Sequence, residues 1–556
     1  MQPNMSRRFA GAVTLMTLCF VLWQCLWAVV TPSFRGPDEV EHFNSVLRVA
    51  TAQNSSVSDQ DSGTPDSSDS SAASDSWSLL DSWPAPGTAT VDAQVLRAVH
   101  EAGFMAGEDD HYALATKTPL RGGLGEGEGF APPYSSVELT APDSRLVVSY
   151  GDDGETPYVD QMTQHPPLFY FAAAKVLELS GALDWAWDGQ LLVLRLFSLA
   201  LTLPLLPSLA YTARRVGLSR GGSLVAAGTL FAVPQLAFTT GTLSNDSLAI
   251  GVGALTMAVC AHVMFVRASW RAVVLAGALL GIGLWSKGTF IPMGLVVFLS
   301  FVLGRDTSTT RQRLLKGVSA GGIGVLVGGA WWIRNLVVFH ALQPAGKERD
   351  ALGQGNDFVE YARRSLSLFV DSSWGSFGWL EWTLNSYLVG TLAGATAVAL
   401  VVSVARGPDR LRRLTLLTFH LGVGVLLLVQ AWTAYSEAGY VSGVQGRYLF
   451  PGIVGMLAVA GAAWIPGLEG LIRRQGWSFA RFVPAVGIAV VALYALVAWA
   501  RACYPGAGIL GLDWSRWALA IGWDMSSLGI VVALGLLSLF GASIASVHAL
   551  RASPQS

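Results

Sequence analysis

Long apolar runs separated by short polar connections make up most of the chain. Most of these runs have about the twenty residues that an α-helix needs to cross a hydrocarbon core of about 30 Å. One long polar stretch follows the first run and interrupts the pattern. The pattern predicts twelve transmembrane helices, at about 9–30, 190–212, 222–242, 245–266, 271–286, 288–304, 316–339, 384–404, 414–434, 447–465, 482–500 and 525–547.

A shorter apolar run at 166–180 fits either a membrane span or a helix lying on the membrane surface. The positive charges favour the surface helix, because the basic clusters then all fall on one side of the membrane. By the positive-inside rule that side is the cytoplasm, which also holds both termini and leaves the long polar stretch outside. The clusters are Arg7/Arg8, Arg214/Arg215/Arg220, Arg267/Arg271, Arg305/Arg311/Arg313/Lys316, Arg406/Arg410/Arg412/Arg413, Arg473/Arg474/Arg481 and Arg551.

The long external stretch differs from the rest of the chain in charge and complexity. Residues 31–164 hold 22 of the 38 Asp and Glu residues and 6 of the 36 Lys and Arg residues, so they carry −16 and the remainder +14. The part at 52–76 is almost entirely Ser, Asp, Ala, Thr and Gly, which predicts disorder. Apolar spacing at 38–51 and, more weakly, at 91–105 predicts helices along the membrane surface.

These features divide the chain into four parts. They are a first transmembrane helix (1–30), a long acidic external loop with juxtamembrane helices (31–189), a multi-span transmembrane core (190–548) and a cytoplasmic tail (549–556). The first run follows two arginines but lacks a clear small-residue cleavage site, so we expect a retained helix. The expected fold class is an all-α polytopic membrane protein with about twelve transmembrane helices and no large C-terminal soluble domain.

The composition excludes several classes of protein. With 52% hydrophobic and only 13% charged residues, the chain is neither a cytosolic enzyme nor a disordered scaffold. The basic excess does not lie on a soluble face, which excludes a nucleic-acid partner. The four cysteines have neither the pattern of a disulfide framework nor a metal-binding spacing, and no phosphate-binding glycine loop is present.

Two adjacent carboxylates follow the first span directly. Asp38 and Glu39 stand after Gly36 and Pro37, and the proline predicts an extended turn that directs them to the membrane boundary. Adjacent carboxylates that lose solvation raise each other's pKa unless a cation lies between them, so one of them could act as a general base. The alternative is a helix N-terminus, where both carboxylates complement the helix dipole.

Other polar residues stand at the outer ends of predicted helices. His165 precedes two prolines that start a helix, so it is either a site residue or an ordinary residue near a helix cap. Asn245 and Asp246 stand between two spans, where they either cap a helix or hold a substrate hydroxyl or a loop.

Three cations stand apart from the cytoplasmic clusters. Lys287, Arg334 and Arg447 occupy the outer ends of spans, against the positive-inside bias. Each could simply anchor its helix, but three at similar depth indicate a site for an anionic lipid headgroup. The segment from Trp374 to Trp379 adds aromatic residues and glycines, which are typical of a sugar or lipid groove or of an interfacial aromatic belt.

Taken in order, these motifs resemble the GT-C glycosyltransferases. The resemblance extends from residue 1 to about 465 and is strongest for a bacterial branch of predicted membrane proteins of unknown function. The motifs are Gly-Pro-Asp-Glu-x-x-His-Phe at 36–43, His-Pro-Pro-Leu at 165–168, Asn-Asp at 245–246, Trp-Gly-x-Phe-Gly-Trp at 374–379 and Gln-Gly-Arg-Tyr at 445–448.

The resemblance implies transfer of a sugar from a polyprenyl-phosphate donor to a glycan, lipid or protein acceptor of the cell envelope, on the outer face of the bacterial plasma membrane. It implies that Asp38 is the catalytic base or orients the acceptor, with Glu39 as its partner. Lys287, Arg334 and Arg447 are assigned to the donor phosphate by position and charge. Supporting contacts with substrates are assigned to His42, His165, Asn245, Asp246, Trp374 and Tyr448.

The sequence leaves the cofactor and two other functions open. A divalent cation such as Mg²⁺ or Mn²⁺ beside Asp38, Glu39 and His165 is one alternative, but this set lacks the spacing of a known site and we expect no obligatory structural metal.

The expected partners are the lipid-linked sugar, the envelope acceptor and the bilayer. A flippase for lipid-linked saccharides and a non-catalytic envelope assembly factor are the alternative functions; charges gathered at one surface, rather than at the midplane, favour the transferase.

Overall fold

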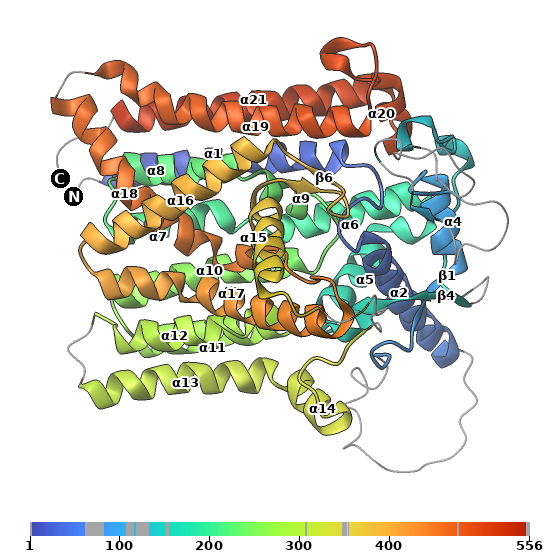
Figure 1. Ribbon diagram of the computed structural model, residues 1–556, viewed down its shortest axis with the longest axis horizontal. Helices are drawn as coiled ribbons and strands as arrows, with labels where there is room; N and C mark the ends of the chain where they lie inside the picture. The colour runs from blue at the N-terminus through green and yellow to red at the C-terminus, as the bar shows by residue number, and fades with distance from the viewer. Residues whose placement is uncertain are drawn as a thin grey trace.

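Helices form most of the protein, and the majority run in one common direction (Figure 1). The computed structural model describes residues 3–61, 83–106, 116–117, 120, 133–151, 155–305, 309–346, 353, 355–474 and 477–551. A smaller group of elements, which includes α2, α4, α5, β1 and β4, lies at one end of this bundle.

The helices of the bundle are α1 (Pro3–Val30), α6 (Trp187–Leu201), α7 (Leu205–Val216), α8 (Arg220–Gly228), α9 (Pro234–Thr240), α10 (Asp246–Phe265), α11 (Trp270–Leu284), α12 (Met293–Val302), α13 (Thr310–Gly328), α14 (Ala330–Phe339), α16 (Ser386–Arg406), α17 (Arg410–Ala438), α18 (Ile453–Arg474), α19 (Phe482–Cys503) and α21 (Met525–Arg551). The remaining α-helices are α2 (Glu39–Asp61), α4 (Ala93–Glu101), α5 (Leu168–Ser180), α15 (Phe358–Trp374) and α20 (Trp514–Ile521). Three 3-10 helices bear on the site, namely η4 (Gln161–Gln164), η7 (Gly288–Phe290) and η8 (Gly446–Gly452).

The described strands form three small antiparallel pairs. They are β1 (Thr90–Asp92) with β4 (Glu155–Val159), β2 (Met105–Ala106) with β3 (Thr116–Lys117), and β5 (Ser376–Phe377) with β6 (Trp382–Thr383). Since these pairs are so short, the protein has the all-α class expected from the sequence.

Every predicted apolar run contains helix, but the number of membrane spans is lower than twelve by length and composition. Among the described residues, eight helices are long and apolar enough to cross a membrane, or ten if each of two bent pairs is one span. The bent pairs are α8 with α9 and α13 with α14. The runs at 271–286 and 288–304 form the shorter helices α11 and α12; α11 has 15 residues and therefore rises only about 22 Å.

The run at 166–180 is not a candidate span. It forms α5, which has 13 residues and packs against α2 and α6. Pro167 precedes its first helical residue, and Gly181 ends it in the left-handed conformation with φ of 69°. The helix is therefore too short to cross the bilayer, as the charge distribution predicts.

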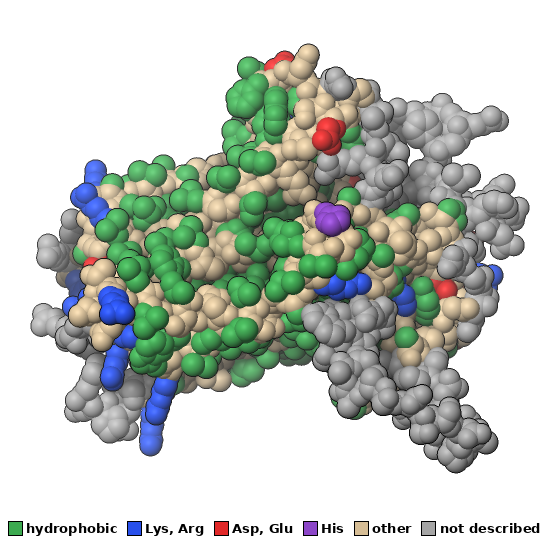
Figure 2. Space-filling model, turned by 90° about the horizontal axis from the view of Figure 1, so that it is seen from below, with side chains coloured by type: hydrophobic (Ala, Val, Ile, Leu, Met, Phe, Trp, Pro, Cys, Tyr) green, Lys and Arg blue, Asp and Glu red, His purple; other side chains and the backbone are tan. Residues whose placement is uncertain are grey.

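The two ends of the chain lie at the same end of the bundle (Figure 1). Basic side chains gather at this end of the face seen in Figure 2, while hydrophobic side chains cover the belt beside it. Arg214 and Arg215 lie in the last turn of α7 and Arg406 in the last turn of α16. The two termini at one end agree with the predicted topology, in which both termini lie on the same side of the membrane. Which side of the membrane this is stays a prediction.

The external segment contains more ordered structure than its composition indicates. The helix predicted at 38–51 is α2, which continues through residues 52–61, a part of the tract predicted to be disordered. Once its buried first half is formed, a helix can extend at little further cost, which explains the difference. Residues 62–76 lie outside the described residues. The stretch 91–105 forms α4 between β1 and β2.

A buried aspartate joins the parts of this external segment. Asp160 is fully buried and accepts hydrogen bonds from Asn44 Nδ2 (2.9 Å), Ser45 Oγ (2.7 Å) and Arg48 Nη1 (2.9 Å) of α2. Its other oxygen caps η4 through the amide of Met162 (2.9 Å). The carboxylate thus fixes α2 against the segment that leads to His165.

Candidate functional site

A tight turn brings Asp38 and Glu39 to the end of α1. Asp38 adopts a left-handed conformation (φ 57°), which aspartate tolerates better than most residues, and its carbonyl accepts the His42 amide at 2.9 Å. A Cβ at Gly36 would lie 2.6 Å from Thr242 Cβ, so only glycine allows the turn to sit against the segment before α10. The turn directs the two carboxylates to different partners.

Glu39 is fully engaged in a buried ion pair with Arg195 of α6. Arg195 donates to both carboxylate oxygens, from Nε to Oε1 at 2.8 Å and from Nη2 to Oε2 at 2.7 Å. The amides of Gly36 (3.1 Å) and Leu243 (2.8 Å) also donate to Glu39. Arg195 further donates to the carbonyls of Ala28, Thr31 and Pro32. Both oxygens of Glu39 are therefore occupied, and Glu39 holds the turn in place. Its ion-pair partner, Arg195, differs from that of Asp38, which is Arg447.

Asp38 belongs to a cluster of two carboxylates and two cations. Arg447 Nη2 donates to Asp38 Oδ2 at 2.7 Å, and Arg447 Nε lies 3.4 Å from Asp246 Oδ2. Lys287 Nζ donates to Asp246 Oδ1 at 2.7 Å. Gln161 Nε2 donates weakly to the other oxygen of Asp38 at 3.3 Å. We call Asp38, Asp246, Lys287 and Arg447 the charge cluster.

Tyr448 completes the charge cluster from one side. The centroid of its ring lies 4.5 Å from Lys287 Nζ and 5.3 Å from Arg447 Cζ, so both cations lie within cation–π distance of this ring. These residues meet because α10, which begins at Asp246, packs against η8, which contains Arg447 and Tyr448, and against α11, which leads to Lys287.

Arg447 has hydrogen-bonding capacity that the described residues do not use. It is only 3% exposed, yet its Nε and Nη1 atoms have no hydrogen-bond partner among the described residues, and neither does Asp246 Oδ2. Buried guanidinium groups normally satisfy most of their five donors. Nη1, and Nε beyond its 3.4 Å contact with Asp246 Oδ2, are suited to donate to the oxygens of a phosphate or carboxylate.

The charge cluster keeps Asp38 ionised. Burial would raise the pKa of Asp38, but the positive charges of Arg447 and Lys287 outweigh it and lower the pKa to about 2. The sequence predicts a raised pKa for the adjacent carboxylates unless a cation lies beside them; Arg447 is such a cation for Asp38, and Glu39 is paired with Arg195. The carboxylate, a quarter exposed, is an anion able to accept a proton.

Two uncharged histidines border the charge cluster. His42 Nδ1 lies 3.1 Å from the hydroxyl of Tyr170, and the two rings stack. Burial lowers the pKa of His42 to about 3, and burial together with Lys287 lowers the pKa of His165 well below its usual value. His165 is buried and its Nδ1 has no hydrogen-bond partner among the described residues. Both rings are therefore neutral hydrogen-bonding groups.

Asn245 lies beside the charge cluster, next to Asp246. Its side chain is fully buried, and Nδ2 donates to the Ser286 carbonyl at 3.4 Å, while Oδ1 has no partner in the described part of the chain. Asn245 thus connects the start of α10 to the turn that presents Lys287.

Arg334 and Trp374, also predicted as site residues, lie apart from the charge cluster. Arg334 packs against the rings of Trp331 and Phe339 on its own helix α14, and no ion pair within the described ranges joins it to Asp38 or Asp246. Trp374 ends α15 and is 8% exposed. The segment after Trp374 packs inward, because Phe377 is fully buried against Trp27 and Trp499. Phe377 therefore lines neither an open groove nor an interfacial aromatic belt, the two alternatives for this segment.

The described residues contain no group of three or more His, Cys, Asp or Glu side chains that could hold a metal ion. Asp38, Glu39 and His165 do not form such a group, since Glu39 faces Arg195. The oxygen atoms of Asp38 and Asp246 are instead matched by cations of the chain.

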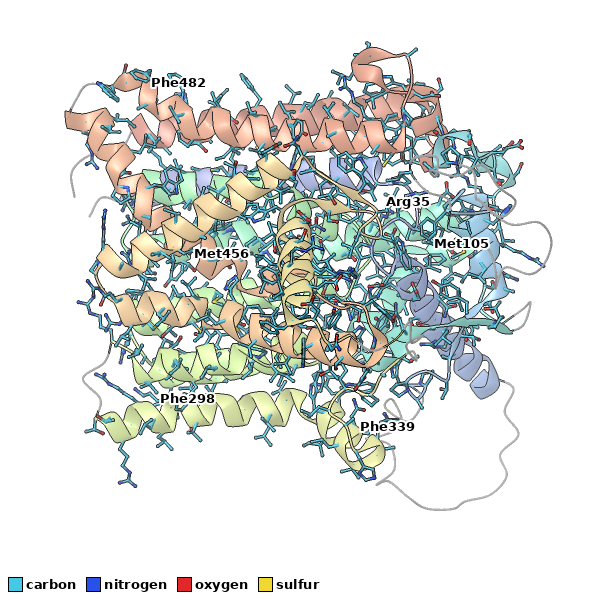
Figure 3. The ribbon with its side chains drawn as sticks, viewed as in Figure 1. Arg35, Met105, Phe298, Phe339, Met456 and Phe482 are labelled. Atoms are coloured by element: carbon cyan, nitrogen blue, oxygen red, sulfur yellow. The ribbon has the colours of Figure 1, made fainter. Side chains whose placement is uncertain are left out.

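Sequence reasoning missed three residues that shape the site. Arg195 was the one with a readable signal, since a charged residue inside an apolar run requires a buried partner. Gln161 and Tyr170 carry no such signal, because neither residue type is unusual near a helix start. Arg35 is likewise buried in the loop that leads to Asp38, where it pairs with Glu381 at 2.6 Å (Figure 3).

Comparisons with known proteins place the chain among membrane proteins. The family model described as "Predicted membrane protein (DUF2142)" matches residues 149–456. No protein of curated function matches the chain in sequence.

Several solved structures are similar to the chain at low identity. ArnT from Cupriavidus metallidurans is 16% identical in its apo state (TM-score 0.38) and 17% identical when bound to undecaprenyl phosphate (TM-score 0.37), and each match covers 70% of this chain and 66% of ArnT. Arabinofuranosyltransferase AftD from Mycobacteria is 18% identical (TM-score 0.34), with 59% of this chain and 22% of AftD covered. The oligosaccharyltransferase of Archaeoglobus fulgidus is 13% identical (TM-score 0.34), with 62% of this chain and 48% of that protein covered. The chain thus spans slightly less than two thirds of ArnT and smaller parts of the other two.

Proposed function

The chain belongs to the DUF2142 family of predicted membrane proteins, and we propose that it is an integral-membrane glycosyltransferase. It moves a sugar from a polyprenyl-phosphate-linked donor to an acceptor of the cell envelope, with inversion at the anomeric carbon. The reaction takes place on the external face of the bacterial plasma membrane, opposite the basic end that holds the termini.

The observation that carries the proposal is the charge cluster. It places an ionised, partly exposed carboxylate, Asp38, 2.7 Å from a buried guanidinium whose Nη1 has no hydrogen-bond partner among the described residues and whose Nε makes only a 3.4 Å contact with Asp246. A transfer from a lipid phosphate requires these two groups, a proton acceptor and a fixed positive charge for the leaving phosphate. Lys287 supplies a second cation, which lies 4.5 Å from the ring of Tyr448.

In the proposed reaction, Asp38 accepts the proton of the acceptor hydroxyl as its oxygen attacks the anomeric carbon. The bond between that carbon and the phosphate oxygen breaks, and its electron pair leaves with the phosphate, which gains one negative charge. Arg447 and Lys287 stabilise this charge in a largely buried environment, where electrostatic attraction is stronger than in water. Attack from the side opposite the phosphate inverts the configuration.

Binding of the donor also makes Asp38 a better base. Its pKa of about 2 reflects the adjacent positive charge of Arg447 and Lys287. A phosphate bound to these cations offsets their charge, so the pKa of Asp38 rises toward its usual value. A carboxylate with a higher pKa accepts a proton more readily, which favours transfer only when the donor is in place.

His42, His165 and Asn245 support the substrates in this proposal. His165 Nδ1 and Asn245 Oδ1 are buried atoms without partners among the described residues, and sugar hydroxyls can satisfy both. Neutral rings add no charge to the site, so they orient hydroxyl groups without competing for the phosphate.

An Asp38→Asn variant tests the proposal. The purified protein in lipid nanodiscs is incubated with a radiolabelled polyprenyl-phosphate sugar and with cell-envelope extract as the acceptor source. The variant keeps the size and the hydrogen bond of Asp38 but cannot accept a proton, so we expect transfer to fall at least about a hundredfold with normal expression. Asp143→Asn, which removes an exposed carboxylate of the same external segment, is the matched control and should transfer normally. Normal transfer by Asp38→Asn contradicts the proposal.

A further inference from the structure

Helix α14 carries three buried polar atoms without a hydrogen-bond partner among the residues that the structure describes. They are Trp331 Nε1, Arg334 Nη1 and Asn335 Oδ1. The side chains of Trp331 and Asn335 are fully buried. A buried polar atom that makes no hydrogen bond costs about 1–3 kcal/mol, so three of them within two helical turns point to a ligand.

The three residues lie on one side of the helix. Arg334 is three positions and Asn335 four positions after Trp331, a spacing that makes side chains neighbours on a helix surface. The Arg334 guanidinium lies 5.6 Å from the Trp331 ring and 5.5 Å from the Phe339 ring, so it is held between them. The group therefore offers two donors, one of them cationic, and one acceptor.

The location of α14 indicates a ligand from the membrane. The chain bends by 67° between α13 and α14, which turns α14 away from the direction of α13. Ile333, Leu336, Val337 and Val338 are exposed on α14. Phe339, at the end of α14, lies at the edge of the molecule (Figure 3). An amphiphile with a polar anionic group and an apolar chain fits such a helix.

The α14 group also adjoins the turn that presents Lys287. Trp332 Nε1 donates to the Leu284 carbonyl at 3.1 Å, which ties α14 to the end of α11. The Trp332 ring and the Gln343 side chain both lie close to Gly288, where an added Cβ would be 3.1 Å from Trp332 Cη2 and would displace the end of Gln343. This packing holds α14 against the turn that presents Lys287.

We propose that α14 is a second phosphate-binding site, which holds the lipid-linked donor before its phosphate moves to Lys287 and Arg447. The identity of the lipid rests on the proposed function. The phosphate oxygens accept hydrogen bonds from Trp331 and Arg334, a sugar hydroxyl donates to Asn335, and the polyprenyl chain lies along the exposed apolar side chains of α14. Arg334, which lies apart from the charge cluster, thus binds the donor at an earlier stage.

Native mass spectrometry of the full-length protein tests this site by counting bound lipids. The protein is titrated separately with a polyprenyl phosphate and with phosphatidylglycerol. We expect wild type to retain two polyprenyl phosphates at saturation, and Arg334→Gln and Arg447→Gln each to retain one. Arg364→Gln, which removes an exposed arginine paired with Glu360 on α15, is the matched control and should retain two.

The outcomes separate this inference from the proposed function. One polyprenyl phosphate lost in Arg447→Gln but none in Arg334→Gln overturns the second site alone. Unchanged retention in Arg447→Gln counts against the proposed function. Equal, Arg334-dependent retention of phosphatidylglycerol overturns the assignment to the donor and makes the site one for bulk lipid.

Two further variants protect the test against misfolding. Trp331→Phe keeps an aromatic ring but removes the Nε1–H donor together with part of the buried indole, and we expect the second polyprenyl phosphate to bind about tenfold more weakly. Arg334→Lys keeps the positive charge, and we expect it to retain more lipid than Arg334→Gln. If both variants bind lipid as wild type does, α14 does not bind phosphate.

Discussion

Arg447 donates to Asp38 across 409 positions of sequence, with 2.7 Å between Nη2 and Oδ2. The contact joins the turn after the first helix to η8, and the Nε and Nη1 atoms of the guanidinium make no hydrogen bond within the described part of the chain. Asp38 and an incoming phosphate therefore compete for the same cation. This competition underlies the first two predictions.

Replacement of Arg447 should weaken both donor binding and transfer. Arg447→Gln removes the charge and most donors, and we expect a loss of about 10²–10³-fold in kcat, the usual effect of removing one group that stabilises a developing negative charge. Arg447→Lys keeps the charge but not the planar fork, so its loss should be smaller. Arg363→Gln, an exposed arginine on α15, serves as the control. An unchanged kcat in Arg447→Gln rules out the role assigned to this residue.

The ion pair of Asp38 should affect stability only above acidic pH. Its pKa in the folded protein, about 2, lies below the usual value of about 3.9, so the pair stabilises the folded state above the usual pKa. That contribution disappears as the pH falls toward 2. The difference in thermal unfolding midpoint between wild type and Asp38→Asn should therefore be constant from pH 5 to 8 and shrink below about pH 4. A difference that grows on acidification contradicts the assignment.

The Glu39–Arg195 pair should be essential for stability and not for the chemistry itself. Glu39→Gln leaves Arg195 buried without a counter-ion, which costs about 3–5 kcal/mol. The double variant Glu39→Gln/Arg195→Gln removes both charges and should be less destabilised than Glu39→Gln alone. Chemical denaturation in detergent measures both. If the double variant loses the sum of the two single losses, the two side chains are not coupled.

Gly446 should be irreplaceable because of its contact with α15. Its amide donates to Ser372 Oγ at 2.8 Å, and a Cβ at this position would overlap Ser373. Gly446→Ala should displace the adjacent Arg447 and reduce transfer at least about tenfold. Gly424→Ala, in open space on α17, is the control for a glycine replacement in this region and should be silent. Equal activity of the two variants excludes a positioning role for Gly446.

Much of the fold follows from the pattern of the sequence. Each apolar run forms helix, and the match to a family of predicted membrane proteins confirms the branch indicated by the motifs. The number of spans was overestimated because α11 and α12 are apolar along their whole length but too short to cross the bilayer alone. Apolar composition predicts burial, whereas only the helix length limits the distance crossed.

The residues of the charge cluster could be predicted from the sequence, but the ion pairs of Asp38 and Glu39 could not. Asp38, Asp246, Lys287 and Arg447 were each found from their positions at the ends of runs, and the structure brings them together. The sequence could not indicate that Glu39 turns to Arg195, since adjacent residues of a tight turn point to different partners. The low pKa of Asp38 follows from that separation and from Arg447, neither of which is a local property.

The buried contacts of Glu39 also limit how often the turn that carries Asp38 can open. Any motion that lifts the first turn of α2 from the bundle must break its two contacts with Arg195 and the Leu243 amide hydrogen bond, all of them buried. Opening of this turn is therefore rare, and the amide of His42, which bonds to the Asp38 carbonyl, should exchange its hydrogen slowly. The position of Asp38, the proposed base, is thus held by the buried contacts of the neighbouring Glu39.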